Sequence, residues 1–273
     1  MGRPNVGPEA RFFSNLRRSR YFLPGILVGV ALGVFGTVVA SSLLATKPQW
    51  RIVGSALAPT GIGVRDADET VTIRPGALLA FEGDSLTYGL ARPWGANRPP
   101  INGSAARRSV TPFPEEVGKM LGSGVRIANR GVPGDRTLEG LFRWSRVDRA
   151  EAVIIMYGTN DAAFRDGSKE LSPDVYGSLL EALVRRRLYE GSSVILMMPP
   201  PMSEPASTAK IDGYREMVAK VGSRTGVLVL DAASPLQKLR VPLQLDGLHL
   251  TTDANLALAQ YVRAHLIVSE AAQ

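Results

Sequence analysis

The sequence of 273 residues contains no cysteine and only two histidines, His249 and His265. Without cysteine the chain has no disulfide bridge, no cysteine-ligated zinc or iron–sulfur centre and no cysteine nucleophile. Two histidines also argue against any site that needs two or three imidazoles. The composition is otherwise that of a folded protein, because 45% of the residues are hydrophobic and 21% are charged, which excludes a disordered or collagen-like chain.

Acidic residues are scarce near the N-terminus. Residues 1–45 hold five arginines and a single acid, Glu9, so this segment carries +4 of the formal net charge of +7. The rest of the chain carries 27 basic and 24 acidic residues, which leaves +3 for a much longer segment. A basic tail on a nearly neutral body is typical of membrane topology rather than of nucleic-acid binding, so we expect no nucleic-acid partner.

Charged residues are absent altogether from Tyr21 to Thr46. As a helix that rises ~1.5 Å per residue, this apolar run is long enough to cross a hydrocarbon core of ~30 Å. A cleaved signal peptide is the alternative, but its apolar region is normally only ~7–15 residues long. We therefore predict a basic cytoplasmic tail at residues 1–20 and an uncleaved transmembrane anchor at residues 21–45.

Four arginines lie between positions 11 and 20, before the predicted anchor, whereas only Lys47 and Arg51 lie just after it. This bias predicts a single-pass protein of the inner (cytoplasmic) membrane whose C-terminal part is extracytoplasmic, in the periplasm. Gly25, Gly29 and Gly33 share one face of the anchor and would permit self-association, although glycine is common in membrane helices in any case. Residues 46–76 are predicted to form a stalk, with a small hairpin near 71–73.

Strands and helices alternate regularly after the predicted stalk. Helical patterns cover 135–149, where Leu138, Leu141 and Phe142 fall on one face, and begin again at Ser172-Pro173 and at Thr252, the last running to about Val268. Such alternation implies parallel strands with helices on both faces, a three-layer α/β/α sandwich. The five predicted strands are the short apolar runs at 78–81, 125–128, 153–157, 194–198 and 227–230.

Polar residues and glycines follow four of these strands. Gly83-Asp84-Ser85-Leu86 follows the first strand, 129–135 follows the second, and Gly158-Thr159-Asn160-Asp161 follows the third. Asp246-Gly247-Leu248-His249 comes past a loop after the fifth strand. Because the carboxyl ends of parallel strands lie at one edge of the sheet, we expect these segments to form a single site.

The residues at this edge are those that nucleophilic acyl transfer requires. Ser85 needs a base to act as nucleophile, and His249 is preferred because His265 falls in the terminal helix. Asp246 lies three residues before His249 and can fix the tautomer of its imidazole. The Ser85 N–H, a glycine N–H and the Asn160 amide can donate hydrogen bonds to the oxyanion. Glu82 and Asp84 could instead be a glycosidase pair, but we expect them to have a packing role.

These four segments resemble the motifs of the SGNH or GDSL family of serine esterases and lipases, over about residues 77–268. The resemblance implies a flavodoxin-like α/β/α domain, spanning 77–270, that uses no metal and no cofactor. Leu250 stands where family members often have proline. The site residues that the resemblance implies are Ser85 as nucleophile, Gly134 and Asn160 as oxyanion donors, Asp246 as orienting acid and His249 as base.

A long basic loop departs from the usual short connections. About 24 residues separate Gly89 from the helix expected near Pro114, against the usual ~4–6, and no acidic residue occurs from Ser85 through Pro114. Four arginines lie in this loop, so we expect it to form a positively charged wall of the site and to favour anionic substrates.

The sequence therefore predicts a membrane-anchored serine esterase that hydrolyses an acyl ester, O-acetyl or short-chain, through an acyl-enzyme. Its substrate would be an ester-bearing small molecule, a lipid or a polysaccharide. Two alternatives remain open. An O-acyltransferase would pass the same acyl group to a hydroxyl of a surface glycan, and a catalytically silent glycan-binding or assembly subunit would do neither.

Overall fold

The computed structural model describes residues 69–92, 107–143, 148–162, 170–203 and 205–269. All of them belong to the second of two compact units, which comprise Met1–Ala56 and Leu57–Gln273. Within the described ranges, no helix is both long enough and apolar enough to cross a membrane. The predicted cytoplasmic tail, the predicted anchor with its three glycines and most of the predicted stalk lie outside these ranges.

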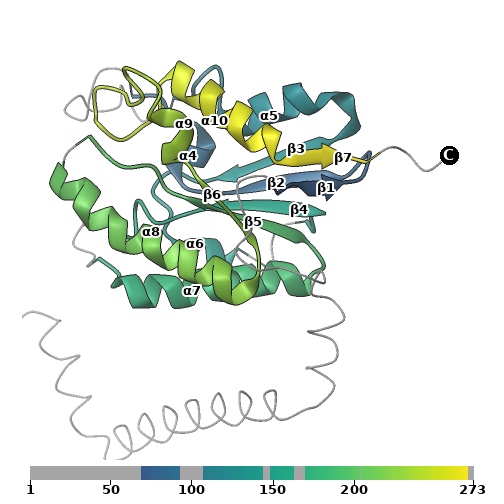
Figure 1. Ribbon diagram of the computed structural model, residues 1–273, viewed down its shortest axis with the longest axis horizontal. Helices are drawn as coiled ribbons and strands as arrows, with labels where there is room; N and C mark the ends of the chain where they lie inside the picture. Colours follow the sequence, from purple (N-terminus) through teal and green to yellow (C-terminus); the bar gives the residue numbers. More distant parts are fainter. Residues whose placement is uncertain (1–68, 93–106, 144–147, 163–169, 204, 270–273) are drawn as a thin grey trace, which may run out of the picture. The chain divides into compact units, whose positions relative to one another are not determined.

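A parallel sheet of five strands forms the centre of the second unit and confirms the predicted strands (Figure 1). The strand order β3-β2-β4-β5-β6 places the first strand between the second and the third. This is the flavodoxin-like order, in which ligands bind where the direction of strand addition reverses. The strands are β2 (Leu78–Gly83), β3 (Arg126–Gly131), β4 (Ala152–Met156), β5 (Ser193–Met198) and β6 (Leu228–Asp231).

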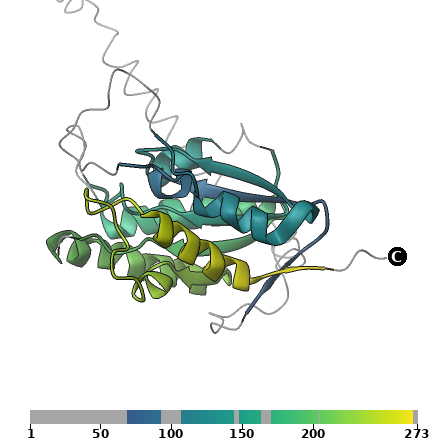
Figure 2. The same ribbon diagram turned by 90° about the horizontal axis from the view of Figure 1, so that it is seen from above.

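Helices cover both faces of this sheet, as Figures 1 and 2 show. One face carries α5 (Phe113–Leu121), which leads into the 3-10 turn η1 (Gly122–Gly124), together with α9 (Ala233–Leu236) and α10 (Thr252–Ala264). The other face carries α6 (Thr137–Phe142), α7 (Pro173–Tyr189) and α8 (Pro205–Thr225).

Alternating side chains of the strands divide the apolar residues between two cores. Phe81 of β2 faces α5, where its ring meets the edge of Phe113 with 5.6 Å between centroids. Its neighbour Ala80 faces the opposite way and packs in the core that includes Tyr176 and Val218. Since successive residues of a strand point to opposite faces, near-continuous apolar strands are what a sheet covered on both sides requires.

A second, two-stranded parallel sheet corrects two predictions. β1 (Val71–Ile73) pairs with β7 (Leu266–Val268), so residues 71–73 do not form a hairpin and the terminal helix does not reach Val268. The N–H of Val71 donates to the carbonyl of His265 at 2.8 Å, directly after α10 ends. Backbone pairing with a segment almost two hundred residues away takes the place of the local hairpin.

The start of α7 is as predicted, whereas α6 differs. Ser172 caps α7 by accepting a hydrogen bond from the N–H of Val175 at 3.3 Å. The predicted inward face of the segment 135–149 is confirmed only for Leu141, which packs against the core, because α6 ends at Phe142, which is 74% exposed. Gly140 faces inward instead, where a Cβ would lie 2.6 Å from the Tyr157 hydroxyl.

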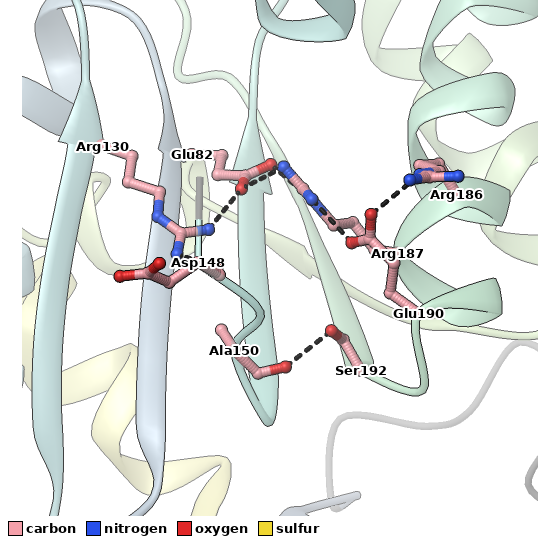
Figure 3. A network of polar contacts seen from close by, with 8 residues as sticks. All are labelled: Glu82, Arg130, Asp148, Ala150, Arg186, Arg187, Glu190 and Ser192. Carbon is pink, nitrogen blue, oxygen red and sulfur yellow. Dashed lines mark hydrogen bonds and ion pairs between the residues drawn. The ribbon is translucent and has the colours of Figure 1, made fainter. Parts of the chain in front are cut away.

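A buried ion network joins the sheet to α7 (Figure 3). Glu82 of β2 and Arg187 of α7 are 5% and 2% exposed, and the guanidinium donates to both carboxylate oxygens at 2.7 and 3.1 Å. Arg130 of β3 donates to the same carboxylate at 3.0 Å, and Arg187 also donates to Glu190 at 2.7 Å. Glu82 therefore has the packing role expected of it, since its carboxylate is engaged by two arginines.

Candidate active site

Ser85 lies in a sharp turn between β2 and a short helix, α4 (Ser85–Tyr88). The Asp84 carboxylate caps this helix by accepting a hydrogen bond from the N–H of Leu86 at 2.8 Å. The helix backbone lies directly against Gly131 at the end of β3, where a Cβ would be 2.2 Å from the Tyr88 nitrogen. The cap and this close approach fix Ser85, which is 3% exposed, at the carboxyl end of β2.

His249 lies between Ser85 and Asp246. Its Nε2 is 2.9 Å from the Ser85 Oγ, and its Nδ1 is 2.6 Å from the Asp246 Oδ2. The backbone N–H groups of Leu248 and His249 donate to the other oxygen of the same carboxylate at 3.1 and 3.0 Å. Asp246 thereby favours the tautomer that carries its proton on Nδ1, and this leaves Nε2 to accept a proton from the serine hydroxyl.

The charge of Asp246 is stabilised by these contacts. Burial alone would raise its pKa, but the hydrogen bonds from the His249 side chain and backbone and from the Leu248 N–H outweigh that effect. The pKa of Asp246 therefore falls to about 2. An ionised carboxylate at neutral pH is what can orient a neutral imidazole and stabilise the imidazolium that forms when it takes a proton.

Gln244 connects the loop that carries His249 to the chain segment after α4. Its backbone N–H donates to the His249 carbonyl at 2.7 Å. Its side-chain amide donates to the carbonyls of Leu90 and Leu250 at 3.3 and 2.6 Å and accepts from the N–H of Arg92. The position of the histidine loop relative to the serine turn is thus set partly by a residue that no sequence motif indicated.

Two further donors lie near the serine. The Asn160 amide donates to the Asp135 carbonyl at 2.8 Å and, over a longer 3.3 Å, to the Asp84 carboxylate. Gly134 occupies the turn after β3 with a φ of 89°, a left-handed conformation that favours glycine. Neither the Ser85 N–H nor the Gly134 N–H makes a hydrogen bond to another residue that the structure describes.

The structure thus brings together the residues that the sequence placed in one site. Ser85, His249 and Asp246 form a continuous hydrogen-bonded chain, while Asn160 contacts the residues next to Ser85 and Gly134. His265 takes no part, since its Nδ1 lies 2.8 Å from the Tyr261 carbonyl at the end of α10. Among the described residues, no group of three or more His, Cys, Asp or Glu side chains is placed to hold a metal ion.

The basic loop does not supply the expected free charge at Arg108. Its guanidinium pairs with Glu115, donates to the Tyr88 carbonyl at 2.7 Å and lies 5.1 Å from the centroid of the Tyr88 ring. Glu115 is the first residue after the acid-free stretch from Ser85 through Pro114, so counting the charges in that stretch did not reveal this partner of Arg108. Arg98, in the middle of the loop, lies outside the described residues.

A groove of about 520 Å³ lies between this loop and the start of α10. Gln244 and Leu250, which flank the loop of Asp246 and His249, form part of its wall. The exposed side chains of Val110 and Val241 also line it. The groove therefore combines apolar and polar groups beside the residues that position His249.

Comparisons with known proteins identify a family and a fold for this chain. The GDSL-like lipase/acylhydrolase family model matches residues 81–256, whereas no curated protein matches the chain. Solved structures share the fold: the chain resembles a lipase/acylhydrolase from Enterococcus faecalis, with 21% identity over 68% of this chain and 93% of that one and a TM-score of 0.56. The carbohydrate acetylesterase Est24 from Sinorhizobium meliloti gives 19% identity, 68% and 96% coverage and a TM-score of 0.55.

An acetyl-xylooligosaccharide esterase from Geobacillus, solved as a mutant, is also similar. It is 25% identical to this chain, with 70% of this chain and 94% of that one covered and a TM-score of 0.55. Because the family model covers more than half of the sequence, the chain belongs to the GDSL-like lipase/acylhydrolase family. It is accordingly a hydrolase of the GDSL type that acts on esters.

Proposed function

We propose that this protein hydrolyses acyl esters with Ser85 as nucleophile, His249 as general base and acid, and Asp246 as the residue that orients the imidazole. The observation that carries the proposal is the continuous contact from the Ser85 Oγ through His249 to Asp246, with distances of 2.9 and 2.6 Å. Both distances lie within the range expected for a nucleophile and its base.

The reaction proceeds in two steps. The Ser85 Oγ attacks the ester carbonyl while its proton passes to the His249 Nε2, and the tetrahedral intermediate then collapses as the leaving alkoxide takes that proton. Water next attacks the acyl-serine, again losing a proton to His249, and the carboxylic acid leaves as Ser85 regains its hydrogen. The N–H groups of Ser85 and Gly134 and the Asn160 amide stabilise the oxyanion in both steps.

An O-acetyl ester of a carbohydrate is the substrate class that we propose. Support comes from two of the similar structures, a carbohydrate acetylesterase and an acetyl-xylooligosaccharide esterase. The groove beside Gln244, about 520 Å³ in volume, is of the size that small ligands occupy, and it borders the loop of His249 without including Ser85 or His249 in its lining. The pairing of Arg108 with Glu115 neutralises one of the four arginines on which the expected preference for anionic esters rests, so that preference stays a prediction.

We also propose that residues 21–45 anchor the enzyme in the inner membrane, with residues 77–270 in the periplasm. The uncharged run from Tyr21 to Thr46 and the arginines that precede it support this placement. In that compartment the natural substrates would be acylated surface glycans rather than cytoplasmic metabolites.

The test compares the Ser85→Ala variant with the Ser178→Ala variant, whose hydroxyl is exposed on α7 and donates to the Asp174 carbonyl. We expect Ser85→Ala to lose p-nitrophenyl acetate hydrolysis and labelling by a fluorophosphonate, and Ser178→Ala to keep both. Substantial turnover by Ser85→Ala would refute the proposed nucleophile.

Product analysis with an acetylated xylooligosaccharide then tests the substrate class. Free acetate as the main product, with or without an added sugar acceptor, supports hydrolysis, whereas transfer of the acetyl group to the acceptor would identify an acyltransferase. If p-nitrophenyl octanoate is turned over faster than the acetate ester, the proposed preference for short acyl groups is wrong.

A further inference from the structure

A buried carboxylate that the proposed reaction does not use lies directly behind the oxyanion donors. Asp161 follows Asn160 in the chain and is fully buried. Both of its oxygens accept hydrogen bonds from one residue, Thr137: the N–H of Thr137 reaches them at 3.1 and 3.2 Å, and its hydroxyl reaches one of them at 3.2 Å. The bonds from Thr137 are the main compensation for the burial of Asp161, and the charge of Arg136 contributes less.

These bonds join the two segments from which the proposed donors come. Gly134 belongs to the turn between β3 and α6 and Thr137 is the first residue of α6, whereas Asn160 and Asp161 belong to the turn after β4. The Asn160 amide holds the turn after β3 at the Asp135 carbonyl, one residue past Gly134. Asp161 holds the same turn two residues further on, at Thr137. Two consecutive residues after β4 therefore fix both the middle and the end of the turn that carries Gly134.

A carboxylate is an unfavourable group to bury, so its presence at position 161 indicates that it has a specific role there. Burial raises the pKa of Asp161 to about 6, and the hydrogen bonds from the backbone and hydroxyl of Thr137 offset this only in part. A buried asparagine would avoid that desolvation. Its side chain has only one oxygen, however, so the Thr137 N–H and the Thr137 hydroxyl would have to share a single acceptor atom. The carboxylate matches both donors of Thr137 at once.

We propose that Asp161 is a positioning residue that acts through Thr137 to set the distance between the Gly134 N–H and the Asn160 amide. The inference rests on the proposed function, in which these two groups bind the oxyanion. Donors in such a site must lie within about 2.7–3.1 Å of the oxygen. A misplacement of about 1 Å can lower the rate 10²-fold. A link between the two turns thus affects the transition state without touching the substrate.

The test is Thr137→Val, which removes the hydroxyl but keeps the β-branched shape and the backbone N–H. Thr137→Ser keeps the hydroxyl. Thr225→Val serves as the matched control, because the Thr225 hydroxyl donates to the backbone carbonyls of Val221 and Gly222 within its own helix, α8, at 2.7 and 3.5 Å. With p-nitrophenyl acetate, we expect Thr137→Val to lower kcat about 10-fold with KM changed less than about 2-fold. Thr137→Ser and Thr225→Val should both remain near the wild-type kcat.

A double-mutant cycle with Asn160→Ala separates positioning from general destabilisation. Loss of one oxyanion donor should lower kcat by about 10²–10³-fold, and Thr137→Val should then add less than about 2-fold, because the geometry it disturbs has already been lost. An equal effect of Thr137→Val in both backgrounds, or none in the wild type, would overturn the proposal for Asp161 while leaving the proposed function intact.

Two other results are decisive. If Asn160→Ala leaves kcat unchanged, the proposed oxyanion role fails and the positioning role fails with it. If Thr137→Val does not fold, Asp161→Asn takes its place, since an amide oxygen can still accept from the Thr137 N–H. A kcat of Asp161→Asn equal to that of the wild type would also refute the proposal.

Discussion

Asp246 holds His249 through both the ring and the backbone of that histidine: one carboxylate oxygen lies 2.6 Å from Nδ1 and the other accepts the backbone N–H at 3.0 Å. This double contact is possible because the two residues are three apart in one tight loop. The carboxylate therefore fixes both the position of the loop and the direction in which the imidazole points. Ser85, 164 residues earlier in the chain, meets the free side of that ring.

The first prediction concerns this orienting bond. Asp246→Asn keeps the shape of the side chain but lets its amide donate toward Nδ1, which favours the wrong tautomer of His249. We expect kcat for p-nitrophenyl acetate to fall by about 10⁴-fold, the loss typical of this change in a Ser–His–Asp triad. Asp174→Asn, at an exposed carboxylate in the first turn of α7, is the control and should lose less than about 2-fold. A loss below about 10-fold for Asp246→Asn would exclude the triad role.

The second prediction concerns pH and Asp135, whose side chain is buried beside the Gly134 turn. Burial raises its pKa from 3.8 to about 6, more than the Arg143 guanidinium can offset. Between these two pH values the folded state binds more protons than the unfolded state, so the free energy of unfolding falls as pH rises. Asp135→Asn cannot titrate, and we expect the stability of the wild type relative to this variant to decrease from pH 4 to pH 6. Urea unfolding across that window measures the difference, and a constant difference would contradict the prediction.

The third prediction concerns the buried pair of Glu82 and Arg187. Arg187→Met removes two hydrogen bonds to Glu82 and leaves its buried carboxylate with Arg130 alone. We expect the free energy of unfolding to fall by about 3 kcal/mol or more, as when one partner of a buried pair is lost. Arg185→Met, on the exposed side of the same helix, breaks only a surface pair with Glu181 and should change stability by less than about 1 kcal/mol. Equal losses of unfolding free energy in the two variants would show that the buried network stabilises the fold no more than a surface ion pair does.

Local patterns were sufficient to predict the sheet and the motifs at its edge. Each strand is a short apolar run, and the polar segments that follow it contain the chemistry, so the order of the chain alone places Ser85, Asn160 and His249 at one edge. Parallel strands impose that arrangement whatever the exact orientation of the helices. The beginning of α7 was equally local, because Ser172 and Pro173 supply its cap and first turn.

Contacts between distant segments could not be predicted in this way. Glu82 and Arg187 are 105 residues apart, and Thr137 and Asp161 are 24 apart, so their pairing depends on how two helices lie on the sheet. The pairing of β1 with β7 depends on the same information. Arg108 looked free because its partner, Glu115, is brought near by the turn into α5. Such pairs leave no periodic signal in the sequence.

The last prediction concerns the N-terminal segment, for which the sequence is the evidence. Arg11, Arg17, Arg18 and Arg20 precede the uncharged run, so we expect N-in, C-out insertion without cleavage. Mass spectrometry of the membrane fraction should therefore recover peptides from residues 1–20 in the mature protein, and protease added to intact spheroplasts should digest the catalytic domain but not this tail. Replacing the four arginines by glutamate removes the charge bias and should reduce the fraction of domains that the protease reaches. A mature N-terminus beyond Ala45 would instead identify the segment as a cleaved signal peptide and the enzyme as secreted.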